Sequence, residues 1–396
     1  MMEYERSLVK QLVTRMNEPR RFMQVVVGLR QTGKTTAVRQ ALEQVRLRHR
    51  FARASRELTM PREWLHREWD SARLLASHSS APVILVVDEI QMIPQWSSIV
   101  KALWDEDTDN GINLIVVLTG SSALLLQKGL REALTGRFEL LRSQQWDYAE
   151  CRDAFGMSLD EYLFFGGYPG SLPLRGDRDR WLSYMTDAII NPSILKDVIG
   201  LERITKPALM SALFSLGSAY SAQELSYRKI MGQLDDAGNT TTIAHYLNVL
   251  SDAGLLSGIQ KYSDKTVRRR ASSPRLAVHD TSLMTVSYGP SRDLLLSDAE
   301  RHGHLVESAV GAYLLRRSVQ ENFEVNWWRD KSNREVDFVI GSGSSRTAIE
   351  VKSGRIRRLD GLDAFCAEYP GTATMVVGSH ETPLEDFLLG NVPLFA

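Results

Sequence analysis

The stretch Gly28-Leu-Arg-Gln-Thr-Gly-Lys-Thr35 decides the fold class of this 396-residue chain. It has the pattern GxxxxGK[ST], follows the apolar run Met23 to Val27 and opens a segment of helical character. A loop in that setting turns backbone N–H groups inward and aims a helix N-terminus at an anion, which is how proteins cradle phosphate. We expect Lys34 to reach the β- and γ-phosphates of a nucleotide and Thr35 to ligate Mg²⁺. A glycine turn that binds nothing is the weaker alternative, because the whole motif lies between a strand and a helix.

Short β-branched runs alternate with helical stretches around this loop, from about residue 23 to residue 141. That alternation predicts an α/β fold with a parallel sheet covered by helices. We expect this ATPase core to span residues 1–145. The five predicted strands are MQVVVG (23–28), RFARAS (50–55), PVILVVDE (82–89), INLIVVLTG (112–120) and RFELLRS (137–143).

Two acids follow the third run, at the end where a parallel sheet would meet the phosphate loop. Asp88 is expected to hold the water shell of the metal, and Glu89 to polarise the attacking water as general base. Two acids directly after a strand more often lie at a solvated strand end. Together with the phosphate loop, however, they favour the catalytic interpretation. The predicted nucleotide- and cofactor-binding residues, for ATP and Mg²⁺, are Gly28, Arg30, Gly33, Lys34, Thr35, Thr36, Asp88 and Ser121.

Two further segments carry groups that can meet a phosphate. The fourth run ends in Thr119-Gly-Ser-Ser122, whose hydroxyls can bond the γ-phosphate or only form a turn; both interpretations stay open. Arg137 in LTGRF can act as an arginine finger, within one chain or on a neighbouring subunit of a homo-oligomer. A surface arginine is the alternative.

The series GLRQTGKT, VILVVDEIQ, VLTGSS, LTGRFELL and FFGGYPG resembles a family of bacterial and archaeal AAA-type P-loop ATPases. The C-terminal domain of that family is catalogued as being of unknown function. The resemblance covers nearly the whole chain. It implies an additional-strand sheet of order 5-1-4-3-2, Glu89 as catalytic glutamate, and Thr119 to Ser122 as sensor 1.

Two segments of helical pattern follow the core. Residues 146–200 are predicted to be a helical lid or connector, broken at Phe165-Gly-Gly-Tyr-Pro-Gly170. Residues 201–264 fit a winged helix-turn-helix with helices at 206–217, 222–234 and 239–253. The last helix would expose Thr240, Thr241, His245 and Asn248 toward DNA, but it carries no Lys or Arg. Packing beside the ATPase as a spacer remains the alternative.

Residues 265–396 contain an acid pattern on two predicted neighbouring strands. Asp337 lies on one strand, and Glu350 and Lys352 share a face of the next. Two carboxylates can bind a divalent cation, and a lysine can help to activate water against a phosphodiester. Glu307, on a helix upstream, can add a third acid. Trp327 and Trp328 can stack on bases, although at least one is expected to face the core.

This arrangement resembles the PD-(D/E)xK nuclease core. The resemblance implies an α/β restriction-endonuclease-like domain with Asp337 and Glu350 as metal ligands, Lys352 as catalytic lysine and Glu307 as auxiliary acid. Val336 stands where the pattern has proline. An ion-pair cluster, or a nuclease fold kept as a scaffold, remains open beside live cleavage.

Composition limits the classes of protein that remain. Lys and Arg number 48 and Asp and Glu 48, so the net charge is zero, which argues against a protein that coats nucleic acid but leaves local basic patches open. Apolar runs are too short for a membrane span, no secretory signal is expected, and Cys151 and Cys366 form no CxxC pair. We therefore expect a cytoplasmic protein without membrane contact. Two hypotheses follow: an ATPase that gates nucleic-acid engagement or cutting, with DNA as partner, or an ATP-dependent switch that recruits a protein.

Overall fold

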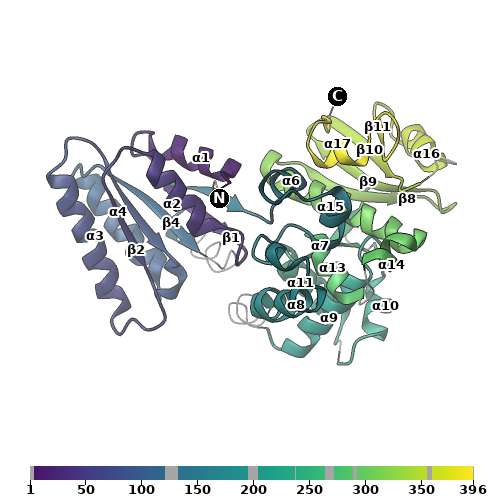
Figure 1. Cartoon of the computed structure of the whole chain (residues 1–396), viewed down its shortest axis with the longest axis horizontal. Coiled ribbons are helices and arrows are strands. Elements are labelled where there is room, and N and C mark those ends of the chain that lie inside the picture. Colours follow the sequence, from purple (N-terminus) through teal and green to yellow (C-terminus); the bar gives the residue numbers. More distant parts are fainter. Residues whose placement is uncertain are drawn as a thin grey trace. The chain divides into compact units, whose positions relative to one another are not determined.

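The computed structural model describes residues 4–120, 133–194, 204–236, 238–263, 272–288, 292–354 and 359–395 (Figure 1). The chain divides into two compact units, Met1–Gln144 and Gln145–Ala396. In the described ranges, no helix combines the length and the apolar character needed to cross a membrane. The four-part division expected from the sequence stays a prediction.

A five-stranded parallel sheet forms the centre of the first unit. The strand order is β2-β3-β4-β1-β5, which confirms the order implied by the family resemblance. All five predicted strands are present. They are β1 (Met23–Gly28), β2 (His49–Arg53), β3 (Val83–Asp88), β4 (Leu114–Gly120) and β5 (Phe138–Ser143).

Both faces of this sheet are covered, which explains why its inner strands are apolar at most positions. Successive side chains of a strand point to opposite faces. Val25 and Val27 pack against α3 and α4, whereas Val26 packs against α1 and α2. The helix bounds are α1 (Ser7–Met16), α2 (Lys34–Gln44), α3 (Pro61–Ser77) and α4 (Trp96–Asp109), with the short η1 (Ile90–Met92) after β3.

Helices dominate the first half of the second unit, as predicted for residues 146–200. A turn at Gly166 and Gly167 separates two groups of helices, and Gly166 has φ +64°. The elements are α6 (Tyr148–Phe155), α7 (Leu159–Phe165), η2 (Leu172–Leu174), α8 (Arg178–Tyr184), η3 (Met185–Ile190), α9 (Pro207–Ala219), α10 (Tyr227–Gly232) and α11 (Thr240–Asp252).

A six-stranded mixed sheet joins the middle and C-terminal segments of this unit. Its order is β11-β10-β9-β8-β6-β7, so strands from both sides of residue 264 share one sheet. The strands are β6 (Leu256–Lys261), β7 (Arg275–Val278), β8 (Glu324–Arg329), β9 (Glu335–Ser342), β10 (Ser345–Val351) and β11 (Ala373–Val377). The accompanying helices are α13 (Thr281–Tyr288), α14 (Arg292–Ser297), α15 (Ala299–Glu321), α16 (Asp360–Glu368) and α17 (Leu384–Leu388).

One predicted helix is wrong in part. The helix expected over 222–234 is reduced to α10, because residues 222–225 run beside β7 instead. Ala222 N–H donates to Leu276 O at 2.8 Å and Leu225 N–H to Pro274 O at 3.1 Å. Ala222 has φ +66°, a left-handed conformation that no helix tolerates.

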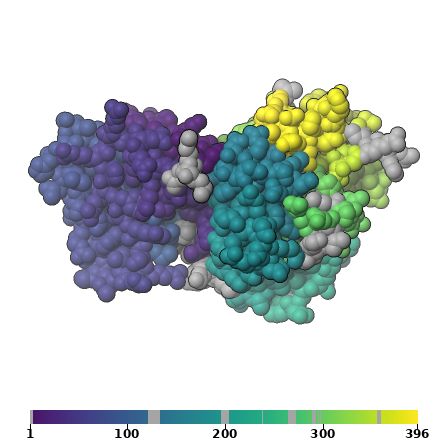
Figure 2. All heavy atoms as spheres, in the orientation of Figure 1, coloured from purple at the N-terminus to yellow at the C-terminus, as the bar shows by residue number. Residues whose placement is uncertain are grey.

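The two ends of the second unit lie side by side. Figure 2 shows the teal atoms of the segment that begins at residue 145 against the yellow C-terminal atoms. The Tyr148 hydroxyl on α6 donates to Glu385 Oε1 on α17 at 2.6 Å. The N-terminal helices of this unit therefore belong to the same compact body as its sheet.

Candidate functional site

The predicted phosphate loop connects β1 to α2, as the motif requires. Gly33 is the N-cap of α2 with φ +87°, a left-handed value that glycine adopts without strain. Gly28 is needed for a different reason. A Cβ there would lie 2.0 Å from Ser143 O on β5, so a side chain would push the loop off the sheet.

Lys34 lies inside this loop. Its side chain is buried, and Nζ donates to Gly28 O at 3.0 Å and to Leu29 O at 2.5 Å. The ammonium is thus held at the N-terminus of α2, where the helix dipole also stabilises a bound anion. This is the place expected for a group that contacts phosphates. Thr36, on the first turn of α2, is exposed.

Asp88 is the centre of the site, with a side chain only 1% exposed. Thr35 Oγ1 donates to both of its carboxylate oxygens at 3.2 Å, and Thr119 Oγ1 donates to Oδ1. Arg53 on β2 lies 3.5 Å from Oδ2, a neighbour that sequence reasoning missed. Hydroxyl and carboxylate oxygens are the ligands that Mg²⁺ prefers, so the donor set of Thr35 and Asp88 fits that ion.

Glu89 stands beside this centre in an unusual backbone conformation. Its φ and ψ are +59° and +40°, which cost a non-glycine residue about 1 kcal/mol. Its N–H donates to Thr119 Oγ1 at 3.4 Å, and its carboxylate accepts from Gln91 Nε2 at 2.5 Å. The motif DEIQ therefore supplies an acid together with the amide that orients it.

The strand that carries Thr119 lies between β1 and β3, as the sensor interpretation requires. Thr119 contacts Asp88 and Glu89 together, so it links the two acids. Ser121 and Ser122, also predicted here, lie outside the described residues.

Arg137 lies at the opposite edge of the sheet. Its carbonyl accepts from Met23 N–H at the start of β1, about 16–20 Å from the phosphate loop for a six-residue strand. Its guanidinium makes a bidentate ion pair with Asp105 on α4, with Nε–Oδ1 at 2.7 Å. That hydrogen bond lowers the pKa of Asp105. A finger role within the same chain does not fit this position, so only the role on a neighbouring subunit stays a prediction.

Arg6 is a residue of this site that sequence reasoning missed. It is buried, and Nη1 donates to Thr32 O in the phosphate loop at 2.8 Å and to Ser143 Oγ at 3.3 Å. Nη2 donates to Gln144 O at 3.3 Å. No motif includes Arg6; its only signal is a basic residue beside an otherwise apolar helix start.

In the second unit, α11 presents the predicted polar face. Thr240, Thr241, His245 and Asn248 are all exposed, while Ile243, Leu247 and Leu250 face the core. The basic run 265–271 that could add positive charge lies outside the described residues.

The predicted C-terminal acids come together at a hairpin. Strands β9 and β10 are antiparallel with Phe338 opposite Ile349, which brings Asp337 next to Glu350. Lys352 Nζ lies 2.6 Å from Glu350 Oε1, and Asp337 Oδ2 accepts from Val351 N–H at 2.8 Å. Glu307 projects from α15 toward the same place.

An arginine that sequence reasoning missed lies among these acids. Arg275, the first residue of β7, has a side chain only 5% exposed. Its guanidinium lies 2.9 Å from Glu307, 2.8 Å from Glu335 and 3.2 Å from Asp337. Burial alone would lower the pKa of Arg275, but these carboxylates outweigh it and raise that pKa.

The divalent metal implied by the nuclease resemblance does not fit this arrangement. Within the described ranges, no three His, Cys, Asp or Glu side chains are disposed to hold a metal ion. The base-stacking expectation also fails, because Trp327 and Trp328 are both buried.

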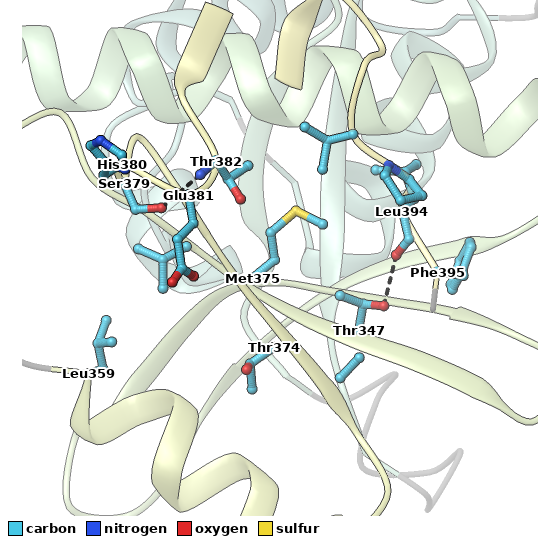
Figure 3. A pocket seen from close by; sticks show the side chains of 14 residues that line it. Thr347, Leu359, Thr374, Met375, Ser379, His380, Glu381, Thr382, Leu394 and Phe395 are labelled. Carbon is cyan, nitrogen blue, oxygen red and sulfur yellow. Dashed lines mark hydrogen bonds between the residues drawn. The ribbon is translucent and has the colours of Figure 1, made fainter. Parts of the chain in front are cut away.

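A cavity of about 680 Å³ lies in the second unit, beside β11 and the C-terminal residues (Figure 3). Met375 points into it, and Thr347 Oγ1 donates to Leu394 O at its wall. None of the predicted site residues lines it.

Three family profiles match successive parts of the chain. The family described as an AAA domain matches residues 20–152. Two families described as domains of unknown function, DUF8612 and DUF4143, match residues 157–291 and 302–393.

Similar chains occur in bacteria. An uncharacterized protein of Mycobacterium tuberculosis is 25% identical over 373 residues, which cover 91% of this chain and 78% of that protein. An uncharacterized protein of Haemophilus influenzae is 22% identical over 354 residues, covering 83% and 82%.

Two solved structures are also similar. The Walker-type ATPase PABY2304 of Pyrococcus abyssi has 17% identity and a TM-score of 0.48, covering 71% of this chain and 94% of that one. The ORC1 protein of Aeropyrum pernix, solved in complex with DNA, has 12% identity and a TM-score of 0.32, covering 73% and 94%. Because both TM-scores lie below 0.5, the class of this protein rests on other findings.

The segment that matches the AAA domain holds the phosphate loop and the whole parallel sheet from β1 to β5. The first unit is therefore similar to an AAA domain and carries a phosphate loop on a parallel sheet.

Proposed function

We propose that this chain is a Mg²⁺-dependent ATPase that binds ATP at the P-loop and hydrolyses it with Glu89 as general base. The observation that carries the proposal is the joint contact of Thr35 and Thr119 with Asp88, next to the acid Glu89. It brings the loop, the metal-holding acid and the base to one edge of the sheet.

Each residue has a defined task in this proposal. Lys34 and the N-terminus of α2 bind the phosphates. Thr35 and Asp88 would hold Mg²⁺, which would supply positive charge beside the phosphates. Gln91 orients the Glu89 carboxylate, which accepts a proton from the attacking water. Thr119 connects Asp88 to Glu89 and keeps both acids in place.

The Glu89→Gln variant tests this assignment. We expect ATP binding to survive while hydrolysis falls by a factor of about 100 or more, because the amide cannot accept the proton of water. Fluorescent-nucleotide titration and phosphate release measure the two properties. The control is Glu43→Gln, an exposed position on α2. Hydrolysis that is unchanged in Glu89→Gln would remove Glu89 as the base.

We further propose that ATP hydrolysis gates the engagement of nucleic acid by the second unit. The exposed polar face of α11, with Thr240, Thr241, His245 and Asn248, supports this coupling. The alternative is a switch that recruits a protein partner, with the C-terminal fold as an inactive scaffold. The occupied acid cluster around Arg275 favours that alternative for the nuclease-like part.

ATPase rates with and without duplex DNA separate these two functions. A DNA-acting ATPase should be stimulated, and Asn248→Ala should reduce the stimulation without changing the basal rate. The DNA-stimulated ATPase rate should return to the basal rate as the salt concentration rises, because contacts with DNA phosphates are electrostatic. An ATPase rate that does not change when DNA is added at low salt would favour the alternative function, a switch that recruits a protein partner.

A further inference from the structure

The guanidinium of Arg275 contacts several groups that lie close together in the second unit. Nε donates to Ala222 O at 2.9 Å, Nη1 to Glu335 Oε1 at 2.8 Å, and Nη2 to Glu307 Oε2 at 2.9 Å. Nη2 also lies 3.2 Å from Asp337 Oδ1. A planar guanidinium that serves three carboxylates and a carbonyl is bound far more firmly than a surface arginine.

These contacts already engage several of the carboxylate oxygens of the cluster. Asp337 Oδ1 lies against Arg275, and Oδ2 accepts a hydrogen bond from Val351 N–H, so both oxygens of Asp337 already have donors beside them. Glu335 pairs with Arg329 as well as with Arg275. Glu350 is held by Lys352, and its Oε2 is the buried oxygen that accepts no hydrogen bond among the described side chains. An oxygen on a carboxylate that is already paired with an ammonium does not by itself make a divalent-cation site.

The cluster is nevertheless open to solvent. A polar pocket of about 630 Å³ is lined by Arg275, Glu307, Glu335 and Asp337. Ions can therefore reach the carboxylates, and the arginine is not merely trapped in a sealed core. A second positive charge entering here would meet the guanidinium at the ligands themselves, where low dielectric strengthens repulsion.

We propose that Arg275 takes the place of a divalent cation in the C-terminal acid cluster. Glu307, Glu335 and Asp337 then form a permanent ion-pair network that ties β7 to α15 and β9. The pocket binds no divalent metal, and the chain does not cut phosphodiester bonds there. This ion-pair network does not require ATP hydrolysis, so it is independent of the proposed function.

Metal binding by the full-length protein tests the inference directly. Bound Mn²⁺ is measured by electron paramagnetic resonance without nucleotide, in the wild type and in Asp337→Asn. We expect the same amount of Mn²⁺ in both, and no Asp337-dependent cleavage of single- or double-stranded DNA or RNA in Mn²⁺. A Mn²⁺ ion or a cleavage activity that disappears in Asp337→Asn would overturn the proposal.

Removal of the arginine gives the converse test. In Arg275→Ala we expect one additional Mn²⁺, lost again in Arg275→Ala combined with Asp337→Asn, and a Tm that Mn²⁺ raises more than in the wild type. Arg275→Lys keeps the charge and should gain no Mn²⁺. Arg334→Ala, an exposed arginine paired with Asp330, is the control and should behave as the wild type.

Each result of the converse test is decisive. A folded Arg275→Ala protein that gains no Mn²⁺ would overturn the claim that the arginine stands in a cation's place. If Arg275→Ala does not fold, the comparison of the wild type with Asp337→Asn decides alone.

Discussion

Asp88 shows how a few side chains give the first unit its chemistry. It is buried at the end of β3, where an unpaired carboxylate would be costly, and two hydroxyls from neighbouring elements satisfy it. Those hydroxyls come from the loop and from β4, so the site depends on the register of three parallel strands. Motif spacing predicted that Thr35 and Asp88 lie close together, because strand ends of a parallel sheet meet at one edge.

Arg6 extends this network and can be tested by itself. In Arg6→Ala the carbonyl of Thr32 loses a buried charged donor, so we expect the first unit to lose about 1–3 kcal/mol of stability. ATP binding should weaken as well, because the P-loop is less well held. Thermal unfolding and nucleotide titration measure the two effects. Arg15→Ala, a more exposed arginine on the same helix, is the control, and equal losses in both variants would contradict the role.

At the scale of elements, periodicity predicted the helices and strands whose local sequence patterns agree with their tertiary contacts. The five strands of the first unit and the helix over 239–253 are of this kind. The segment 222–225 is not, because its backbone pairs with β7 across about 50 residues and its helical composition is overruled. Arg275 was missed for the same reason. A basic run predicts a solvated loop, but the following Leu-Ala-Val makes a strand that carries the arginine into the acids.

Helix α11 offers a test at this scale. Asn239 Oδ1 accepts from Thr242 N–H at 2.9 Å and caps the helix. Asn239→Ala should therefore cost about 1 kcal/mol of stability in the second unit, measured by urea unfolding. Asn248→Ala, on the exposed face of the same helix, is the control and should change stability little. Equal destabilisation by the two substitutions would show that the cap contributes nothing.

At the scale of the whole molecule, the two units keep their buried charges in different ways. The first has Lys34 and Asp88 at the edge of the sheet that carries the phosphate loop, and Asp107 on α4 paired with Arg73, whereas the second distributes its buried charges along its interior contacts. Asp280, just before α13, accepts from Gly167 N–H at 2.8 Å and so fixes the turn between the helical groups. A Cβ on Gly166 would overlap this carboxylate, and a Cβ on Gly167 would overlap Trp146 O, which explains the glycine pair in FFGGYPG. The sequence predicted a turn there but not its distant partner.

Asp280 and its neighbour His279 should shift stability with pH in opposite directions. Burial raises the pKa of Asp280 from 3.8 to about 6, so the folded second unit loses stability as pH rises from 4 to 6. Burial lowers the pKa of His279 from 6.5 to about 4, so stability rises with pH between 4 and 6.5. Each shift corresponds to about 3 kcal/mol, and together they nearly cancel.

Single substitutions separate these two contributions. As pH rises from 4 to 6.5, the stability of Asp280→Asn relative to the wild type should increase by about 3 kcal/mol. Over the same range, the stability of His279→Gln relative to the wild type should decrease by a similar amount. Urea unfolding monitored by hydrogen exchange in peptides from residues 272–288 reports the second unit alone. Asp293→Asn, at a side chain 87% exposed, is the control. Differences that stay constant across this pH range would show that neither group is buried in the charge state assigned to it, because only a pKa changed by folding makes stability depend on pH.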